Sequence, residues 1–281
     1  MSKLFDLSTG AMPGIAPMRS TKTTNRTAGV TGNDARKAAS TKKLGLVLLG
    51  AAFTLCQVAT AQPQSPVNLG SAAPFAVLAQ TGVTNVGNTV ITGDLGVWPI
   101  AGTAVTGFSG ENAGGPGKVI GTIQDNDTAG ETLAAKHGQA SLGIAIDDAK
   151  GRTGAFKYIN YNLGGSTLTP GLYRNSGILT ISGNLYLSGA GVYIFQIATG
   201  LTATVNTHVF LENGAVASNV FWQVGTQATL GSDVVFEGNI LAGTAITMTD
   251  GTTLNGRALA QANVTLIHDV VTVPTTRRQG N

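Results

Sequence analysis

An eight-residue motif, in which apolar and polar residues alternate toward a final threonine, recurs along the chain. Its full copies are VLAQTGVT at 77–84, FQIATGLT at 195–202, WQVGTQAT at 222–229, ILAGTAIT at 240–247 and ALAQANVT at 258–265. Weaker copies are LYRNSGIL at 172–179 and PIAGTAVT at 99–106. The last three full copies are 18 residues apart, which suits a coil with three sides of about six residues each. The step of 27 residues before them predicts one coil with a longer loop near residues 212–218.

Read as a strand, the motif predicts which side chains point outward. The seventh position should point into the core, because it is apolar in every full copy: Val83, Leu201, Ala228, Ile246 and Val264. Alternation then turns the sixth and eighth positions outward and leaves the fifth near a corner. Thr204 and Thr249, two residues beyond the motif, should also face outward. The eighth position is threonine throughout the full copies: Thr84, Thr202, Thr229, Thr247 and Thr265.

The predicted threonine surface carries no charged residue. Threonine is a good strand former, so outward threonines alone can mean no more than a solvated surface that suits β structure. Ordinary exposed strands, however, carry Lys and Glu, which also prevent strand edges from pairing. An aligned row of threonines with small neighbours and no charge therefore favours a surface that meets a flat, regular partner.

The β pattern is interrupted over about residues 107–151, where we expect a loop or cap followed by a helix. The Gly- and Pro-rich stretch 110–117 is typical of a loop. Thr128 and Glu131 have the spacing of a capping box, Asp127 suits the helix dipole, and Gly151 would end the helix. The apolar residues Leu133, Ala140 and Ile144 recur at helical spacing. We expect this helix to cover one face of the stacked coils.

Residues 1–61 are expected to form an N-terminal extension and secretion signal. Lys42 and Lys43 precede an apolar run over 44–55, and Ala59-Thr60-Ala61 is a cleavage site of the A-x-A type. The run is too short for a membrane-spanning helix. We therefore expect cleavage near Ala61 and a secreted protein, either extracellular, periplasmic or at the cell surface.

Removing this segment changes the charge of the chain and leaves a single domain. Residues 1–61 hold eight of the 17 Lys and Arg but two of the 14 Asp and Glu, so the remainder has nine basic and twelve acidic residues. A mildly acidic remainder argues against a nucleic-acid-binding protein. Because the single cysteine is Cys56, the mature chain has no disulfide or thiol chemistry. We expect one domain over 62–274, a polar tail over 275–281, and no membrane insertion after cleavage.

Polysaccharide-cleaving enzymes also use stacked β coils, but they need carboxylates clustered on one face. Asp147 and Asp148 are adjacent on the predicted helix and point apart, and among the later carboxylates only Asp233 and Asp250 could approach each other. The three histidines do not have the spacing of metal ligands. We therefore expect no catalytic residues, no metal and no cofactor.

The order of motifs over residues 66–274 resembles the microbial β-solenoid ice-binding proteins. The motifs are APFAVLAQTGVTN, ITGDLGVWP and GTAVTGF, a helix ending in DDAKGR, then LTPGLYR, YIFQ, VFWQV, FEGNILA and NGRALAQANVTL. The resemblance implies an all-β-dominated fold, a right-handed, three-faced β-solenoid with one long α-helix alongside. It also implies a discontinuous order of coils, with the N-terminal strands stacked near the C-terminal coils.

The family's ice-binding motif, T-A/G-x-T/N, is matched at 81–84, 199–202 and 244–247. It also fits at 103–106, although that copy leads into the interruption and its place on the face stays open. Gln227, Ala262, Asn263 and Leu179 depart from the pattern. The resemblance implies a monomer that adsorbs to ice through ordered water, with thermal hysteresis and inhibition of ice recrystallisation; an adhesin or carbohydrate-binding module using the same face is the alternative. The residues expected to bind are Thr81, Gly82, Thr84, Thr199, Gly200, Thr202, Thr204, Thr226, Thr229, Thr244, Ala245, Thr247, Thr249 and Thr265.

Overall fold

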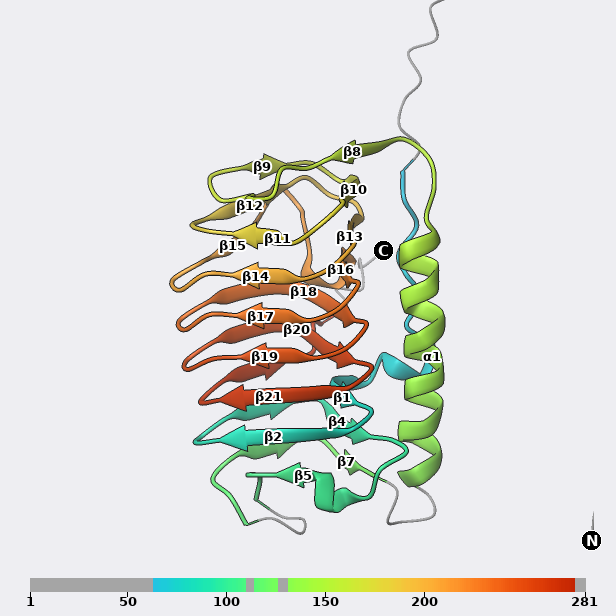
Figure 1. The fold of residues 1–281 in the computed structure, drawn as a ribbon, viewed down its shortest axis with the longest axis vertical. Coiled ribbons are helices and arrows are strands. Elements are labelled where there is room, and N and C mark those ends of the chain that lie inside the picture. The colour runs from blue at the N-terminus through green and yellow to red at the C-terminus, as the bar shows by residue number, and fades with distance from the viewer. Residues whose placement is uncertain (1–62, 110–113, 126–130, 276–281) are drawn as a thin grey trace, which may run out of the picture. The chain divides into compact units, whose positions relative to one another are not determined.

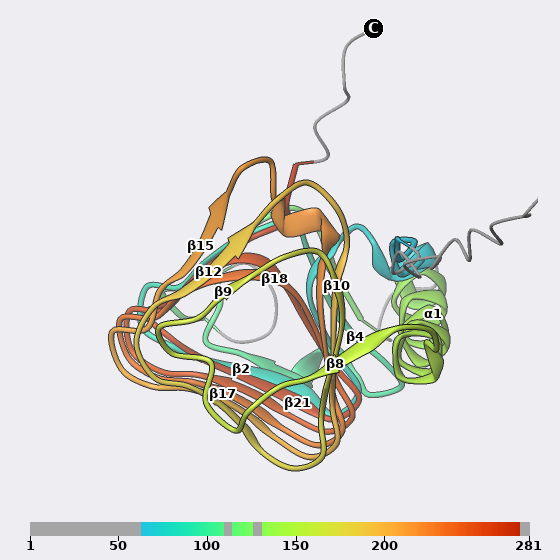
Figure 2. The same ribbon diagram turned by 90° about the horizontal axis from the view of Figure 1, so that it is seen from above.

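A computed structural model describes residues 63–109, 114–125 and 131–275, all within the unit Gln57–Asn281. Over these residues the chain winds into a β-solenoid of triangular cross-section, with one helix beside it (Figures 1 and 2). All the ladders between named strands are parallel. The predicted three-sided solenoid with a helix alongside is confirmed. None of the helices among the described residues is long and apolar enough to cross a membrane.

One side of the triangle is a seven-stranded sheet, called here the threonine sheet. It consists, in spatial order, of β11 (Leu179–Ile181), β14 (Leu201–Ala203), β17 (Ala228–Leu230), β19 (Ile246–Met248), β21 (Asn263–Ile267), β2 (Gly82–Val86) and β5 (Val105–Thr106). The 3-10 helix η2 (Gly102–Ala104) leads into β5.

The second side faces the helix. Its strands are β8 (Phe156–Tyr158), β10 (Gly171–Asn175), β13 (Tyr193–Ile197), β16 (Val220–Val224), the C-terminal halves of β18 (Val235–Ala242) and β20 (Thr253–Ala260), then β1 (Phe75–Ala79), β4 (Asp94–Val97) and β7 (Ile123–Gln124). Every residue of β1, β13 and β16 is buried. Such continuous burial is typical of parallel strands covered on both faces.

The third side is formed by shorter strands and by the N-terminal halves of β18 and β20. The shorter strands are β9 (Thr167–Leu168), β12 (Leu185–Ser188), β15 (Val209–Glu212), β22 (Val270–Thr272), β3 (Val90–Thr92) and β6 (Lys118–Ile120). β18 and β20 bend around the corner between the second and third sides. Gly238 allows this bend because its backbone has φ 109° and a Cβ there would collide with Val220.

The stacking order of the coils does not follow the sequence. β2 pairs with β21, β1 with β20 and β3 with β22, so the N-terminal coils extend the stack beyond the C-terminal ones. Figure 1 shows the cyan N-terminal strands directly below the red C-terminal strands. The discontinuous order implied by the family resemblance is confirmed. The predicted longer loop is also present, because η3 (Ala217–Asn219) follows β15 within the coil of 27 residues.

Stacked side chains of successive coils fill the interior. Tyr173, Phe195, Trp222 and Phe236 form a continuous aromatic stack, with neighbouring ring centroids 5.1, 3.9 and 5.0 Å apart. These rings, together with the inward residues of all three sides, make one apolar core. Because each coil buries its apolar face only against its neighbours, this column of aromatic contacts binds one coil to the next.

The helix α1 (Glu131–Gly151) packs against the second side, and η1 (Gly70–Ala72) also contacts it. The helix and its end at Gly151 were predicted correctly, but its apolar stripe was not. Leu133, Ala140 and Ile144 are exposed, Ile144 by 69%. The buried face is instead lined mainly by small residues with two larger ones: Ala135, Gly138, Leu142, Ala145, Ile146 and Ala149.

The packing distance explains this correction. A Cβ at Gly138 would lie 2.9 Å from the ring of Phe75, so the helix can lie this close to Phe75 only with a glycine at that point. The buried face is therefore the one that contains Gly138, and Leu142 and Ile146 pack further along the helix on the same face. Thr128, proposed for the capping box, and Asp127, proposed to suit the helix dipole, lie outside the described residues, as do residues 110–113 of the stretch 110–117 and all of residues 1–61.

Candidate functional site

Seven threonines, one from each strand of the threonine sheet, stand in register. Each strand pairing places the threonine of one strand opposite that of the next, and we call this row the threonine column. Its members, in spatial order, are Thr180, Thr202, Thr229, Thr247, Thr265, Thr84 and Thr106. Neighbouring strands are about 4.8 Å apart, so the side chains repeat at that interval. In the six strands other than β5, the residues on either side of each threonine are buried, which turns the threonines outward; in β5, Val105 before Thr106 is buried.

The structure brings together all five eighth-position threonines that the sequence motif singled out. It also settles the place of 103–106, because Val105 and Thr106 of β5 pair with Val83 and Thr84. The weak copy at 172–179 was aligned one residue too early. Leu179 pairs with Leu201 and is buried, so it occupies the seventh position, and Thr180 takes the eighth. Matching apolar Leu179 to the apolar seventh position would have found Thr180 from sequence.

A second row runs along the corner at the fifth position of the motif. Thr199, Thr226 and Thr244 are exposed, and their backbones are joined in sequence by hydrogen bonds of 2.8 and 2.9 Å. The same chain of backbone bonds continues from Thr244 through Ala262 to Thr81. Of these five corner positions, all but Ala262 therefore carry threonine beside the threonine column.

Between the two rows lie the sixth-position residues, which decide how level the surface is. Four of them are small: Gly200, Ala245, Gly82 and Ala104. Gln227 and Asn263 are exposed, and Ile178 at the sheet's end is 56% exposed. At Gly200 a Cβ would meet the carbonyl oxygen of Gln227 at 3.3 Å, which explains why a small residue suits that place.

Thr204 and Thr249 lie just past the ends of β14 and β19, and both are only partly exposed. The Thr249 hydroxyl donates to the carbonyl oxygen of Leu230 at 3.0 Å, and that of Thr204 lies 3.4 Å from the carbonyl oxygen of Ile181. These bonds join each hydroxyl to the neighbouring coil. The two threonines are thus placed to hold the corner, and their hydroxyls are less free than those of the threonine column.

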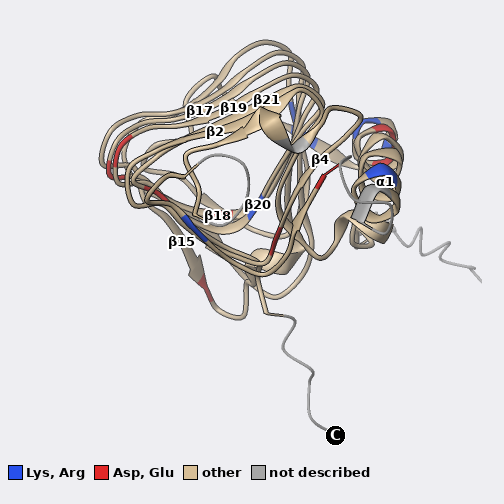
Figure 3. Ribbon diagram, turned by 90° about the horizontal axis from the view of Figure 1, so that it is seen from below, with Lys and Arg blue, Asp and Glu red and all other residues tan. Residues whose placement is uncertain are grey.

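No strand of the threonine sheet contains Asp, Glu, Lys or Arg. Figure 3 shows the face over β17, β19, β21 and β2 without charge, with several acidic residues at one corner and other charges on α1 and on the other two sides. The corner contains Asp250, whose carboxylate lies 2.7 Å from Nδ1 of His268. The surface is therefore neutral across its width and charged only beyond its edge.

The described carboxylates and histidines do not form a metal-binding cluster. No group of three or more His, Cys, Asp or Glu residues within the described part of the chain could hold a metal ion. Asp148 is paired with Arg152, at 2.7 Å. Burial raises the pKa of Glu237 to about 7 even though Asn255 donates a hydrogen bond to it at 2.8 Å. Burial likewise raises the pKa of Asp269 to about 7, against the effect of hydrogen bonds from the backbone of Ile267 and Thr252.

This combination of a triangular solenoid, a covering helix and a neutral threonine surface has close counterparts among known proteins. The sequence profile of the ice-binding-like family matches residues 77–272. The chain belongs to this ice-binding-like family. An ice-binding protein of Flavobacterium frigoris (strain PS1) is 42% identical over 221 residues, covering 74% of this chain and 76% of that protein. An ice-binding protein of Nostoc (strain HG1) is 39% identical, covering 78% of each chain.

Solved structures of this family have the same fold. The ice-binding protein of an Arctic yeast, described for its antifreeze activity, superposes with a TM-score of 0.71 at 32% identity, over 77% of this chain and 97% of that one. The ice-binding protein of the Antarctic ascomycete Antarctomyces psychrotrophicus superposes with a TM-score of 0.68 at 35% identity, over 75% of this chain and all of that one. The recognition of the family from sequence motifs is confirmed.

Proposed function

We propose that this protein binds ice through the threonine sheet, so that it depresses the freezing point and inhibits ice recrystallisation. The observation that carries the proposal is the register of the threonine column across seven neutral strands. The corner row and the small sixth-position residues extend this surface on one side. Membership of the ice-binding-like family supports the proposal and does not favour an adhesin function of the same face.

Ice binding requires a regular array of side chains and no chemically reactive group. Threonine is β-branched and rotationally stiff, so an array of threonines has little side-chain entropy to lose when it meets a surface. Strand pairing repeats the hydroxyl and methyl groups at about 4.8 Å along the stack. We infer that this array orders a layer of water that merges with the ice lattice. Ice growing between adsorbed molecules must then curve, and a curved front melts more readily.

We further propose that the protein acts as a secreted monomer without catalysis or cofactor. The predicted signal over residues 1–61 supports secretion, and membership of the ice-binding-like family supports a role without catalysis. A single rigid solenoid already presents the complete row of threonines, so the proposed site needs no second copy.

Thermal hysteresis of variants of residues 62–281 tests the proposal. Thr247→Lys and Thr202→Tyr place a charge or a bulky ring in the middle of the threonine column, and both should remove most of the hysteresis while the circular dichroism melt is retained. Thr272→Lys is the matched control, because Thr272 lies on β22 of the third side. Unchanged hysteresis in both column variants would exclude this face.

A further inference from the structure

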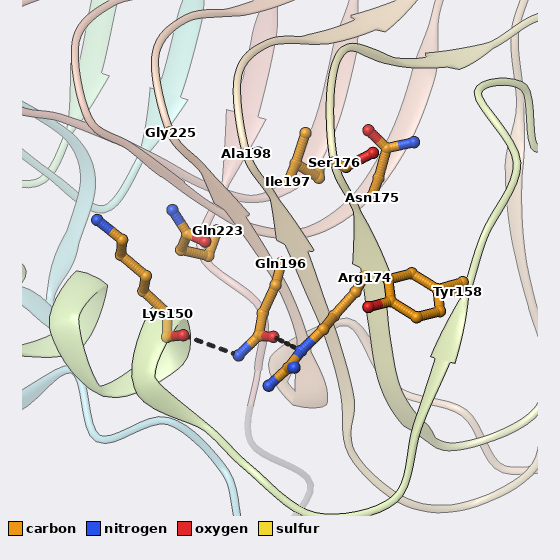
Figure 4. A pocket seen from close by; sticks show the side chains of 10 residues that line it. All are labelled: Lys150, Tyr158, Arg174, Asn175, Ser176, Gln196, Ile197, Ala198, Gln223 and Gly225. Carbon is orange, nitrogen blue, oxygen red and sulfur yellow. Dashed lines mark hydrogen bonds between the residues drawn. The ribbon is translucent and has the colours of Figure 1, made fainter.

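A cavity of about 510 Å³ lies between the C-terminal end of α1 and the corner that leads to the threonine sheet. Figure 4 shows its lining, with Lys150 from the helix, Gln196 and Gln223 from adjacent strands, and Tyr158 from β8. The volume is within the range of small-molecule sites, roughly 300–1,000 Å³. It is separate from the threonine column, although the lining residues Ala198 and Gly225 directly precede Thr199 and Thr226.

The cavity is built on a fixed hydrogen-bonded frame. The Gln196 amide nitrogen donates to the carbonyl oxygens of Ala149, Lys150 and Arg152 at 2.8, 3.0 and 3.0 Å, which caps the end of α1. Its amide oxygen accepts from Nε of Arg174 at 2.6 Å. The lining is therefore already in place before any ligand binds.

Gln223 also lines the cavity, but its side chain takes no part in this hydrogen-bonded frame. It is directly opposite Gln196 on the next strand and only 4% exposed, yet its amide has no hydrogen-bond partner among the described residues. The amide atoms are not fully enclosed, so they border the cavity. Figure 4 shows Gln223 beside Lys150 and Gln196 with no bond drawn to it. The Gln223 amide therefore has a donor and an acceptor that are available to a polar occupant of the cavity.

The charges of the lining residues indicate what kind of ligand the cavity can bind. Lys150 and Arg174 belong to the lining, which contains no carboxylate. The ion pairs found within the described ranges are Arg152–Asp148 and His268–Asp250, so neither lining cation is paired with a carboxylate there. Arg174 is held by the protein itself, because it donates to Gln196 and to the carbonyl oxygen of Arg152 and its guanidinium lies 3.9 Å from the centre of the Phe156 ring. Lys150 is therefore the lining cation that is left to meet a ligand. Cations recognise carboxylates through short, charge-assisted hydrogen bonds, whereas the Gln223 amide and the Ser176 hydroxyl suit sugar hydroxyls.

We propose that this cavity binds a carboxylate-bearing sugar unit of an acidic polysaccharide. The carboxylate lies toward the ammonium group of Lys150, and ring hydroxyls meet the Gln223 amide. Tyr158, 76% exposed at the rim, offers an aromatic face against which a sugar ring can pack. The site differs in chemistry from the neutral threonine sheet and does not depend on ice binding.

Calorimetric titration of residues 62–281 with tri-galacturonate, a neutral trisaccharide and acetate tests this proposal. We expect tri-galacturonate to bind more tightly than the other two, and more weakly as salt is added. Lys150→Gln and Gln223→Leu should each weaken binding by roughly tenfold, the effect of losing one charge-assisted or buried hydrogen bond. Lys136→Gln removes a charge from the same helix outside the cavity lining and should bind as the parent does.

Two results would overturn the proposal. One is the absence of tri-galacturonate binding at millimolar concentration, or equal binding of the neutral trisaccharide. The other is parental affinity in both cavity variants. Thermal hysteresis should be unchanged in Lys150→Gln and Gln223→Leu, which also shows that these variants are folded and keeps this test separate from that of the threonine sheet.

Discussion

Thr229 and Thr247 lie directly opposite each other on the parallel strands β17 and β19, each flanked along its strand by buried residues. Both side chains are therefore held outward by the packing of their neighbours. The same relation is repeated by every strand pair of the threonine sheet, which makes the column a property of the fold rather than of any single side chain.

Gln227 is the longest side chain at the sixth position in the middle of the threonine sheet, between Gly200 and Ala245. It is exposed and rises between the two rows of threonines. Gln227→Ala should therefore make the surface more level and increase thermal hysteresis. The reverse change, Ala245→Gln, should reduce the hysteresis. If neither change alters the hysteresis, the size of the side chain at the sixth position does not affect ice binding.

A substitution at Thr249 tests whether this residue stabilises the fold or contributes to ice binding. Thr249→Val keeps the shape but removes the hydroxyl bonded to the Leu230 carbonyl. We expect a loss of about 1 kcal/mol in the free energy of unfolding, measured by urea denaturation, and nearly parental hysteresis. A large loss of hysteresis at unchanged stability would indicate that Thr249 belongs to the ice-binding surface.

Trp222 lies at the centre of the aromatic stack, 3.9 Å from the ring of Phe195 by centroids. Trp222→Ala should leave a large cavity in the solenoid and lower the free energy of unfolding by about 3–5 kcal/mol. Trp222→Phe, which preserves stacking, should cost much less. Similar denaturation midpoints for the two variants would contradict a structural role of the stack.

Because Glu237 is partly buried, we expect the free energy of unfolding to decrease as the pH rises. Its pKa in the folded protein, about 7, is above its ordinary value of 4.5 because burial disfavours the charged carboxylate. The folded state then holds a proton that the unfolded chain has released, so this contribution is present below about pH 4.5 and is lost as the pH rises to about 7. The melting temperature should fall over that window.

Glu237→Gln isolates this contribution, since the amide is neutral at every pH and can still accept from Asn255. Asp269, whose pKa is also raised to about 7, contributes in the same direction and remains in the variant. We therefore expect a smaller fall in melting temperature for Glu237→Gln than for the parent. An identical fall in the two proteins would exclude Glu237 as a source.

The sequence was most informative where consecutive coils repeat after 18 residues. Apolar residues at the seventh position and threonine at the eighth led directly to Thr229, Thr247 and Thr265, because the strand period of two leaves one choice of face. The weak copy lacked this support, and a shift of one residue hid Thr180. Thr106 was found but could not be placed, since only the fold brings β5 beside β2.

The helix and the corners were harder to predict. The helix sequence is rich in Ala and Gly, so several stripes look equally apolar, and the close approach to Phe75 selects the one with the smallest residues. At the corners, strand alternation ends where the chain turns. Thr204 and Thr249 consequently bond to backbone carbonyls, although alternation alone would turn them outward.

The most direct test is the partition of fluorescently labelled protein between ice and liquid during slow freezing. The double variant Thr229→Tyr/Thr247→Tyr interrupts the threonine column at its centre, and Thr92→Tyr/Thr272→Tyr makes the same changes on β3 and β22 of the third side. We predict that the parent and the third-side variant enter the ice while the column variant, folded by circular dichroism, remains in the liquid. Incorporation of the column variant into ice to the same extent as the parent would contradict the account.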